Sequence, residues 1–93
     1  MPIPRYAAKR DSNENEIASF LEANGVSVTR ISQRGVFDLA CSFGERTCFV
    51  DTKAKYGTLT DSQTKWLRTW QGKTFVIKTI GEALAVVDWL KEL

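Results

Sequence analysis

A short turn in the middle of the chain constrains the fold more than any other feature. Gly44-Glu45 separates two strand-like segments, and a glycine followed by a polar residue is typical of a two-residue β-hairpin turn. That turn pairs Phe43 with Arg46 and places Asp38 opposite Asp51 on one face of the sheet, with Cβ atoms about 4.5–5.5 Å apart. A three-residue loop would shift the pairing by one residue and put the two acids on opposite faces.

Two acids facing each other on a sheet suggest a cation between them. Like charges in that arrangement destabilise a sheet, and a divalent cation would relieve the repulsion. Lys53 follows Asp51 by two residues and joins the same face. The chain contains no histidine, and an oxygen-only site suits magnesium or manganese better than zinc. The alternative is a simple ion pair of Asp51 with Lys53 on a solvated strand face.

Length and composition indicate a small intracellular protein. The chain has 93 residues, enough for one domain over residues 1–93 with one modest core. It lacks an apolar run long enough to span a membrane, and its first residues do not resemble a signal peptide. The register places Cys41 opposite Cys48 on the face away from the acids, where buried thiols are expected. A disulfide is the alternative, but it does not suit a chain without a secretory signature.

The net charge of +2 says little about nucleic acid, but its distribution says more. Arg5, Lys9 and Arg10 make residues 1–10 a basic segment that we expect to be a flexible arm, suited to contact phosphates or to act only as a solubilising tail. We also assign Arg34 and Lys55 to the predicted nucleic-acid-binding surface.

Hydrophobic periodicity and breakers predict the order αβββαβα. This order belongs to the α/β class, with a mixed four-stranded sheet flanked by helices. The expected elements are a helix from Asp11 or Ser12 to about Asn24, strands near 26–31, 35–43 and 46–54, a loop over 55–59, a helix over 60–71, a strand over 75–77 and a helix over 82–93.

Glu14 has two interpretations. It is in line with Ile17 and Leu21 on the buried stripe of the first helix, so it can point toward the acids on the sheet. It also stands three residues after Asp11, as the last member of a helix-capping arrangement. Glu16 is turned toward the flank and is the weaker candidate.

Gln63 also has two compatible roles. Thr60 and Gln63 have the spacing of a capping box. Gln63 also shares the inward side of its helix with Trp66, Leu67 and Trp70. The two tryptophans are interpreted as core residues, with base stacking as the alternative.

The last helix is apolar around more of its surface than one sheet face requires. This surplus favours a homodimer. The apolar residues are Ala83, Leu84, Val86, Val87, Trp89 and Leu90.

Four short motifs together resemble the PD-(D/E)XK nucleases, whose core is restriction-endonuclease-like. The nearest likeness is to stand-alone VRR-NUC domains and to archaeal-type Holliday-junction resolvases, and it covers about residues 9–88. The motifs are Asp11-Ser12-Asn13-Glu14-Asn15-Glu16-Ile17, Gly35-Val36-Phe37-Asp38-Leu39, Val50-Asp51-Thr52-Lys53 and Leu59-Thr60-x-x-Gln63.

The resemblance implies a role for each matched residue. Two departures are visible: Phe37 stands where the family usually has proline, and Asp51 stands where these relatives usually have glutamate. The implied roles are Asp38 and Asp51 as metal ligands, the Thr52 carbonyl as a further ligand, Lys53 as the lysine that positions water and phosphate, Glu14 as the helix-borne glutamate, and Gln63 as the glutamine near the site.

The expected activity is that of an endonuclease that hydrolyses DNA phosphodiester bonds with Mg²⁺ or Mn²⁺. By resemblance it would be a cytoplasmic protein of a bacterium or a phage-infected cell, acting as a homodimer on branched DNA such as a four-way junction or a flap. The alternative is a catalytically inactive nuclease fold that binds DNA or another protein. The sequence does not distinguish DNA from RNA.

Overall fold

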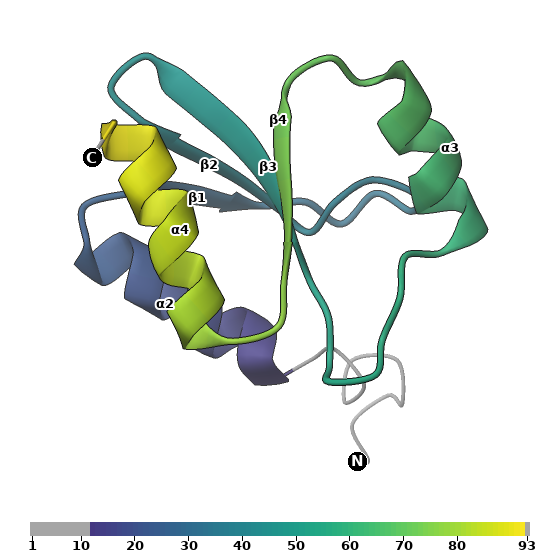
Figure 1. The fold of residues 1–93 in the computed structure, drawn as a ribbon, viewed down its shortest axis with the longest axis horizontal. Coiled ribbons are helices and arrows are strands. Elements are labelled where there is room, and N and C mark those ends of the chain that lie inside the picture. The colour runs from purple at the N-terminus through teal and green to yellow at the C-terminus, as the bar shows by residue number, and fades with distance from the viewer. Residues whose placement is uncertain (1–11, 93) are drawn as a thin grey trace, which may run out of the picture.

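The computed structural model describes residues 12–92. This part of the chain is an α/β fold with three helices and a mixed four-stranded sheet (Figure 1). The elements are α2 (Ser12–Ala23), β1 (Ser27–Arg30), β2 (Leu39–Phe43), β3 (Arg46–Thr52), α3 (Asp61–Thr69), β4 (Lys73–Ile77) and α4 (Ile80–Lys91).

The sheet has the order β1-β2-β3-β4, and its central hairpin has the predicted register. Phe43 pairs with Arg46, and Leu39 pairs with Val50. The β1–β2 and β2–β3 pairs are antiparallel, whereas β3 and β4 are parallel. Gly44 supports the turn with a φ of 62°, a conformation that costs glycine little.

The helices cover the two faces of the sheet differently. Figure 1 shows α2 and α4 together on one side and α3 alone on the other. The side chains between the sheet and α2 and α4 form the apolar core, which excludes water through close packing. Its buried residues are Ile17, Ala18, Leu21, Val26, Leu39, Cys41, Cys48, Val50, Ile77, Ala83, Val86, Val87 and Leu90.

Two predicted boundaries are wrong in an informative way. β2 begins at Leu39 and not near residue 35, because residues 32–37 leave the sheet as a loop that turns at Gly35, whose φ is 82°. α4 begins at Ile80 and not at Glu82, because Thr79 caps it and Glu82 completes a capping box. The other predicted ends that fall within the described residues lie within two residues of the observed ones.

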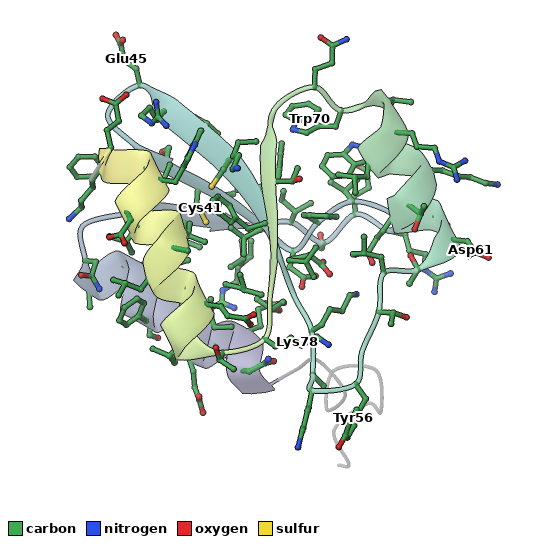
Figure 2. The ribbon with its side chains drawn as sticks, viewed as in Figure 1. Cys41, Glu45, Tyr56, Asp61, Trp70 and Lys78 are labelled. Atoms are coloured by element: carbon green, nitrogen blue, oxygen red, sulfur yellow. The ribbon has the colours of Figure 1, made fainter. Side chains whose placement is uncertain are left out.

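The prediction that Trp70 lies on the buried side of its helix is wrong, because 41% of this residue is exposed. Its ring still packs on Trp66 and edge-on to Phe49, at centroid distances of 5.5 and 4.8 Å. Phe37 completes this aromatic cluster through Trp66. The cluster lies under α3, and Trp70 forms its outer end near the end of that helix (Figure 2).

The cysteine prediction is confirmed. Cys41 and Cys48 are cross-strand partners, both are buried in the core, and both carry free thiols. A hydrogen bond with Cys48, together with burial, raises the pKa of the Cys41 thiol, so this residue stays protonated.

The last helix buries most of its apolar residues. Ala83, Val86, Val87 and Leu90 belong to the core, whereas Leu84 is 49% exposed. Trp89 packs edge-on against Phe75 and under the guanidinium of Arg46, 4.0 Å from the ring centroid. The surplus apolar surface is therefore narrower than the sequence suggested. Across residues 12–92, no helix is both long enough and apolar enough to cross a lipid bilayer.

Candidate active site

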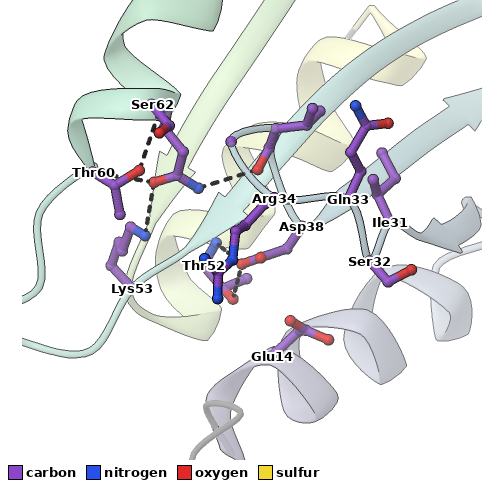
Figure 3. A pocket seen from close by; sticks show the side chains of 13 residues that line it. Glu14, Ile31, Ser32, Gln33, Arg34, Asp38, Thr52, Lys53, Thr60 and Ser62 are labelled. Atoms are coloured by element: carbon purple, nitrogen blue, oxygen red, sulfur yellow. Dashed lines mark hydrogen bonds between the residues drawn. The ribbon is translucent and has the colours of Figure 1, made fainter. Parts of the chain in front are cut away.

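A cleft of about 570 Å³ opens where β3 ends. Four segments surround it: the first turn of α2, the loop before β2, the end of β3 and the first turn of α3 (Figure 3). It brings together five of the residues predicted for catalysis or metal binding, namely Glu14, Asp38, Thr52, Lys53 and Gln63. The other lining residues are Ile31, Ser32, Gln33, Arg34, Gly35, Val36, Thr60 and Ser62.

Asp38 directly precedes the first residue of β2. Its carbonyl accepts a hydrogen bond of 2.7 Å from the Ile31 N–H, which fixes the start of the hairpin. Its Oδ2 accepts hydrogen bonds from the N–H and the hydroxyl of Thr52, at 3.0 and 2.9 Å. Two donors on one oxygen orient this carboxylate, and the hairpin register determines which donors it meets.

Asp51 is fully buried beside the cleft and does not line it. Gln63 Nε2 donates a hydrogen bond of 2.9 Å to Oδ1. Lys53 Nζ lies 3.0 Å from Oδ2 as an ion pair, yet the angle is not that of a hydrogen bond, so Oδ2 is a buried oxygen without a hydrogen-bond donor among residues 12–92. The ion pair is attractive in this geometry because charge attraction depends little on angle.

Burial raises the pKa of Asp51 to about 6. The charge of Asp38 contributes to this increase, whereas the ammonium of Lys53 opposes it. A carboxyl group that needs a neighbouring cation to stay charged near neutral pH is typical of functional sites.

Gln63 connects the parts of the site. Its Nε2 donates to Asp51 and to the Val36 carbonyl, and its Oε1 accepts from Lys53 Nζ at 3.0 Å. Oε1 also accepts from the N–H of Thr60, whose hydroxyl accepts from the Gln63 N–H in a complete capping box. Both predicted roles of Gln63 are confirmed, since one buried amide caps α3 and orients an acid and a lysine.

Lys53 is anchored through its backbone. Its N–H donates to the Ile77 carbonyl at 3.0 Å and so extends the parallel pairing with β4. Its carbonyl accepts a hydrogen bond of 2.9 Å from Asn13 Nδ2, which lies in the first turn of α2. Asn13 also reaches the Lys78 carbonyl, at 3.4 Å. Sequence reasoning missed Asn13, although it adjoins Glu14 in the motif.

Glu14 is buried, with 2% of its surface exposed, and points from α2 toward Asp38 and Thr52 (Figure 3). Its Oε2 accepts a hydrogen bond of 2.9 Å from Arg30 Nη1. The interpretation that Glu14 faces the site is therefore confirmed, while the capping alternative involves Asp11, which lies outside the described residues. Glu16 is exposed, as expected for the weaker candidate.

Sequence reasoning also missed Arg30, the ion-pair partner of Glu14. The signal was present in strand alternation, because Val28 packs against the core and Arg30 lies on the same face, toward α2. An arginine on a strand face that packs against a helix favours an acid on that helix, and Glu14 is the one of its three glutamates that is in line with the buried stripe.

The carboxylate and carbonyl oxygens at the cleft are ligands that suit a hard divalent cation, although in the described part of the chain they do not form a complete metal site. Within residues 12–92, no three acidic, cysteine or histidine side chains are grouped as metal ligands. Asp38 and Asp51 interact electrostatically, and Lys53 forms an ion pair with the buried Oδ2 of Asp51. These two carboxylates would hold the cation, with the Thr52 carbonyl as a further oxygen, since magnesium and manganese prefer such ligands.

Of the residues predicted to contact nucleic acid, one lies at the cleft and another lies outside it. Arg34 is exposed and lines the cleft, next to the acids (Figure 3). Lys55 is exposed but outside the cleft, in the loop that carries Tyr56, and its carbonyl accepts a hydrogen bond from Lys78. The predicted basic arm, with Arg5, Lys9 and Arg10, lies outside the described residues.

Comparisons of this chain with protein-family models, with curated proteins and with solved structures give no match. The functional argument therefore rests on the residues of the cleft.

Proposed function

We propose that this protein is a divalent-cation-dependent deoxyribonuclease with a restriction-endonuclease-like core of the PD-(D/E)XK type. One observation carries the proposal: a lysine is ion-paired with a buried aspartate, opposite a second aspartate, at the edge of a solvent-open cleft. A lone ion pair on a strand does not require a buried glutamine that contacts both partners, and Gln63 does so here.

The chain supplies charge and position for phosphodiester hydrolysis. A bound Mg²⁺ or Mn²⁺ would lower the pKa of a water molecule and neutralise charge on the phosphate. Asp38 and Asp51 would hold that cation. Lys53, whose side chain is 16% exposed, presents its ammonium at the cleft wall beside them, where it can stabilise a phosphate oxygen or orient the attacking water.

The rest of the cleft suits a phosphate backbone. The exposed guanidinium of Arg34 can pair with a phosphate through two hydrogen bonds. The cleft itself is short, so one copy of the chain covers only a few nucleotides. A homodimer acting on branched DNA, a four-way junction or a flap, would join two such clefts, and the exposed Leu84 on α4 is a candidate contact.

A second candidate is a nuclease-fold protein that binds DNA or another protein without cutting. The observation that favours it is the full burial of Asp51, whose side chain is one methylene shorter than the glutamate of the resembled family. Under this alternative the ion pair with Lys53 would be structural.

The deciding experiment is cleavage of a labelled panel of DNA substrates with Mg²⁺ or Mn²⁺: four-way junction, flap, single strand and linear duplex. Asp38→Ala and Lys53→Ala are tested beside Lys73→Ala, an exposed lysine at the start of β4. We expect metal-dependent cutting that the first two substitutions abolish and the third leaves intact. DNA binding by folded protein without any cutting would favour the second candidate, and cutting unaffected by either of the first two substitutions would contradict the assigned site.

A further inference from the structure

Arg30 contacts two side chains of the helix that carries Glu14. Its Nη1 lies 2.9 Å from Glu14 Oε2 and 2.9 Å from Asn15 Oδ1. The arginine comes from the end of β1, and both acceptors are in the first turn of α2. The contact therefore fixes the guanidinium relative to the buried carboxylate.

The two partners differ in burial. The side chain of Glu14 is 3% exposed, whereas that of Arg30 is 43% exposed. A buried carboxylate needs a positive charge or hydrogen bonds close by, because removing a charge from water is costly. The guanidinium of Arg30, in contrast, is already partly hydrated, so moving it into solvent costs little. Arg30 is thus the partner that can leave.

Glu14 lies between the arginine and the cleft. The carboxylate lines the cleft with Asp38 and Thr52, but Arg30 does not. A cation held at the cleft beside Asp38 would therefore lie near Glu14 as well. Two positive groups would then share one carboxylate.

We propose that Arg30 is an internal counter-ion that competes with a divalent cation for Glu14 and thereby sets the cation affinity of the cleft. This inference rests on the proposed cation dependence of the site. Arg30 is a positioning residue in this scheme, since it acts through Glu14. Without the cation it neutralises the buried acid, and with the cation present its attraction for Glu14 weakens binding.

The test is titration of the full chain with Mn²⁺ at pH 8, without DNA, by isothermal titration calorimetry. Arg30→Gln is compared with wild type and with Arg46→Gln, a matched control that removes the same charge from an ion pair with Glu92, at the opposite end of β3 from the cleft. We expect Arg30→Gln to bind Mn²⁺ about three- to tenfold more tightly, since a nearby repelling charge is removed. Arg46→Gln should leave the affinity within about twofold of wild type.

Glu14→Gln shows whether the effect passes through the carboxylate. This substitution should weaken Mn²⁺ binding, and adding Arg30→Gln to it should produce little further change. If circular dichroism shows that Arg30→Gln does not fold, Arg30→Lys is measured instead. A lysine keeps the charge but lacks the guanidinium whose Nη1 bonds both Glu14 and Asn15, so we expect a gain in affinity at the lower end of that range, about threefold.

The outcomes separate this inference from the proposed function. Wild-type binding that Arg30→Gln leaves unchanged or weakens overturns the inference and leaves the proposed function standing. An equal gain in the Glu14→Gln background also overturns it, because the effect would then be a general change of charge. Mn²⁺ binding by Arg30→Gln alone supports the inference, and no binding by any of the folded variants overturns both.

Discussion

The two faces of the sheet are built for different purposes. The face toward α2 and α4 is apolar and closely packed, with Leu39, Cys41 and Val50 among its buried residues. The face toward α3 carries Asp51 and Phe49, covered by one short helix. Neighbouring residues of the same two strands therefore contribute either to stability or to the cleft. The comparison shows how a small chain can hold buried charges without giving up its core.

The sharpest test of this division uses two adjacent residues. Asp38→Asn should reduce cleavage at least about 100-fold, because a cation-binding charge is lost, while the melting temperature stays close to that of wild type. Leu39→Ala should instead lower the free energy of unfolding by about 2–5 kcal/mol, through lost burial and a cavity. Cleavage assays and urea unfolding measure the two effects. A large loss of stability in Asp38→Asn, with activity retained, would break the comparison.

The side of the sheet toward α3 is tested at Gln63. Gln63→Ala leaves Asp51 without its amide donor, so we expect a loss of about 1–3 kcal/mol in stability and roughly 10- to 100-fold in cleavage rate. Gln71→Ala, which changes an exposed glutamine shortly after α3, is the matched control and should be neutral. Equal behaviour of the two variants would mean that the Gln63 side chain has no role in stability or in cleavage, and a loss of stability without a loss of cleavage would mean that it serves only as a helix cap.

The buried acid predicts an unusual pH dependence of stability. Asp51 has a pKa of about 6 in the folded protein against 3.8 for the ordinary group, so the folded state binds more protons between these values. The contribution of Asp51 to stability is full below about pH 4, is lost as the pH rises toward 6, and is constant above it. The expected loss is about 3 kcal/mol. Urea unfolding from pH 4 to 8 measures it.

Two additions sharpen the pH experiment. Asp51→Asn should remove this part of the slope, because the titrating group is gone. Millimolar Mg²⁺ should restore stability above pH 6, where the carboxylate is charged, and should do little near pH 4. A slope that persists in Asp51→Asn would assign it to another carboxyl group.

The smallest effect is expected at the outer end of the aromatic cluster. Trp70 is 41% exposed, so Trp70→Ala should cost about 1–2 kcal/mol and change cleavage of the DNA panel less than threefold. A specific loss of activity on single-stranded DNA, with stability unchanged, would instead support the base-stacking interpretation of this residue.

The sequence allowed good prediction of what depends on neighbours along the chain. The turn at Gly44 determines the hairpin register and with it the positions of Asp38 and Asp51. The spacing of Thr60 and Gln63 predicted the cap on α3. These features are local, because each is decided within one turn or one helical end.

The features that were missed or wrong depend on distant segments. Asn13 meets the Lys53 carbonyl 40 residues away, and the Arg30–Glu14 pair joins a strand to a helix across 16 residues. Trp70 has the spacing of a core residue, yet α3 ends at Thr69, so its ring projects past the end of the helix. Helical periodicity cannot show where the covering surface stops.

The small buried surface of α3 affects its thermal stability and the hydrogen exchange of its amides. Gln63 is the only buried residue among the nine of this helix, and the ring of Trp66 packs against Phe37 and Phe49. Segments with little buried surface open locally at a lower free energy than the core. Amide protons of α3 should therefore exchange faster than those of β2 and β3. Since each opening removes the amide that orients Asp51 and Lys53, the cleft should lose its alignment at temperatures at which the sheet and its other two helices remain folded.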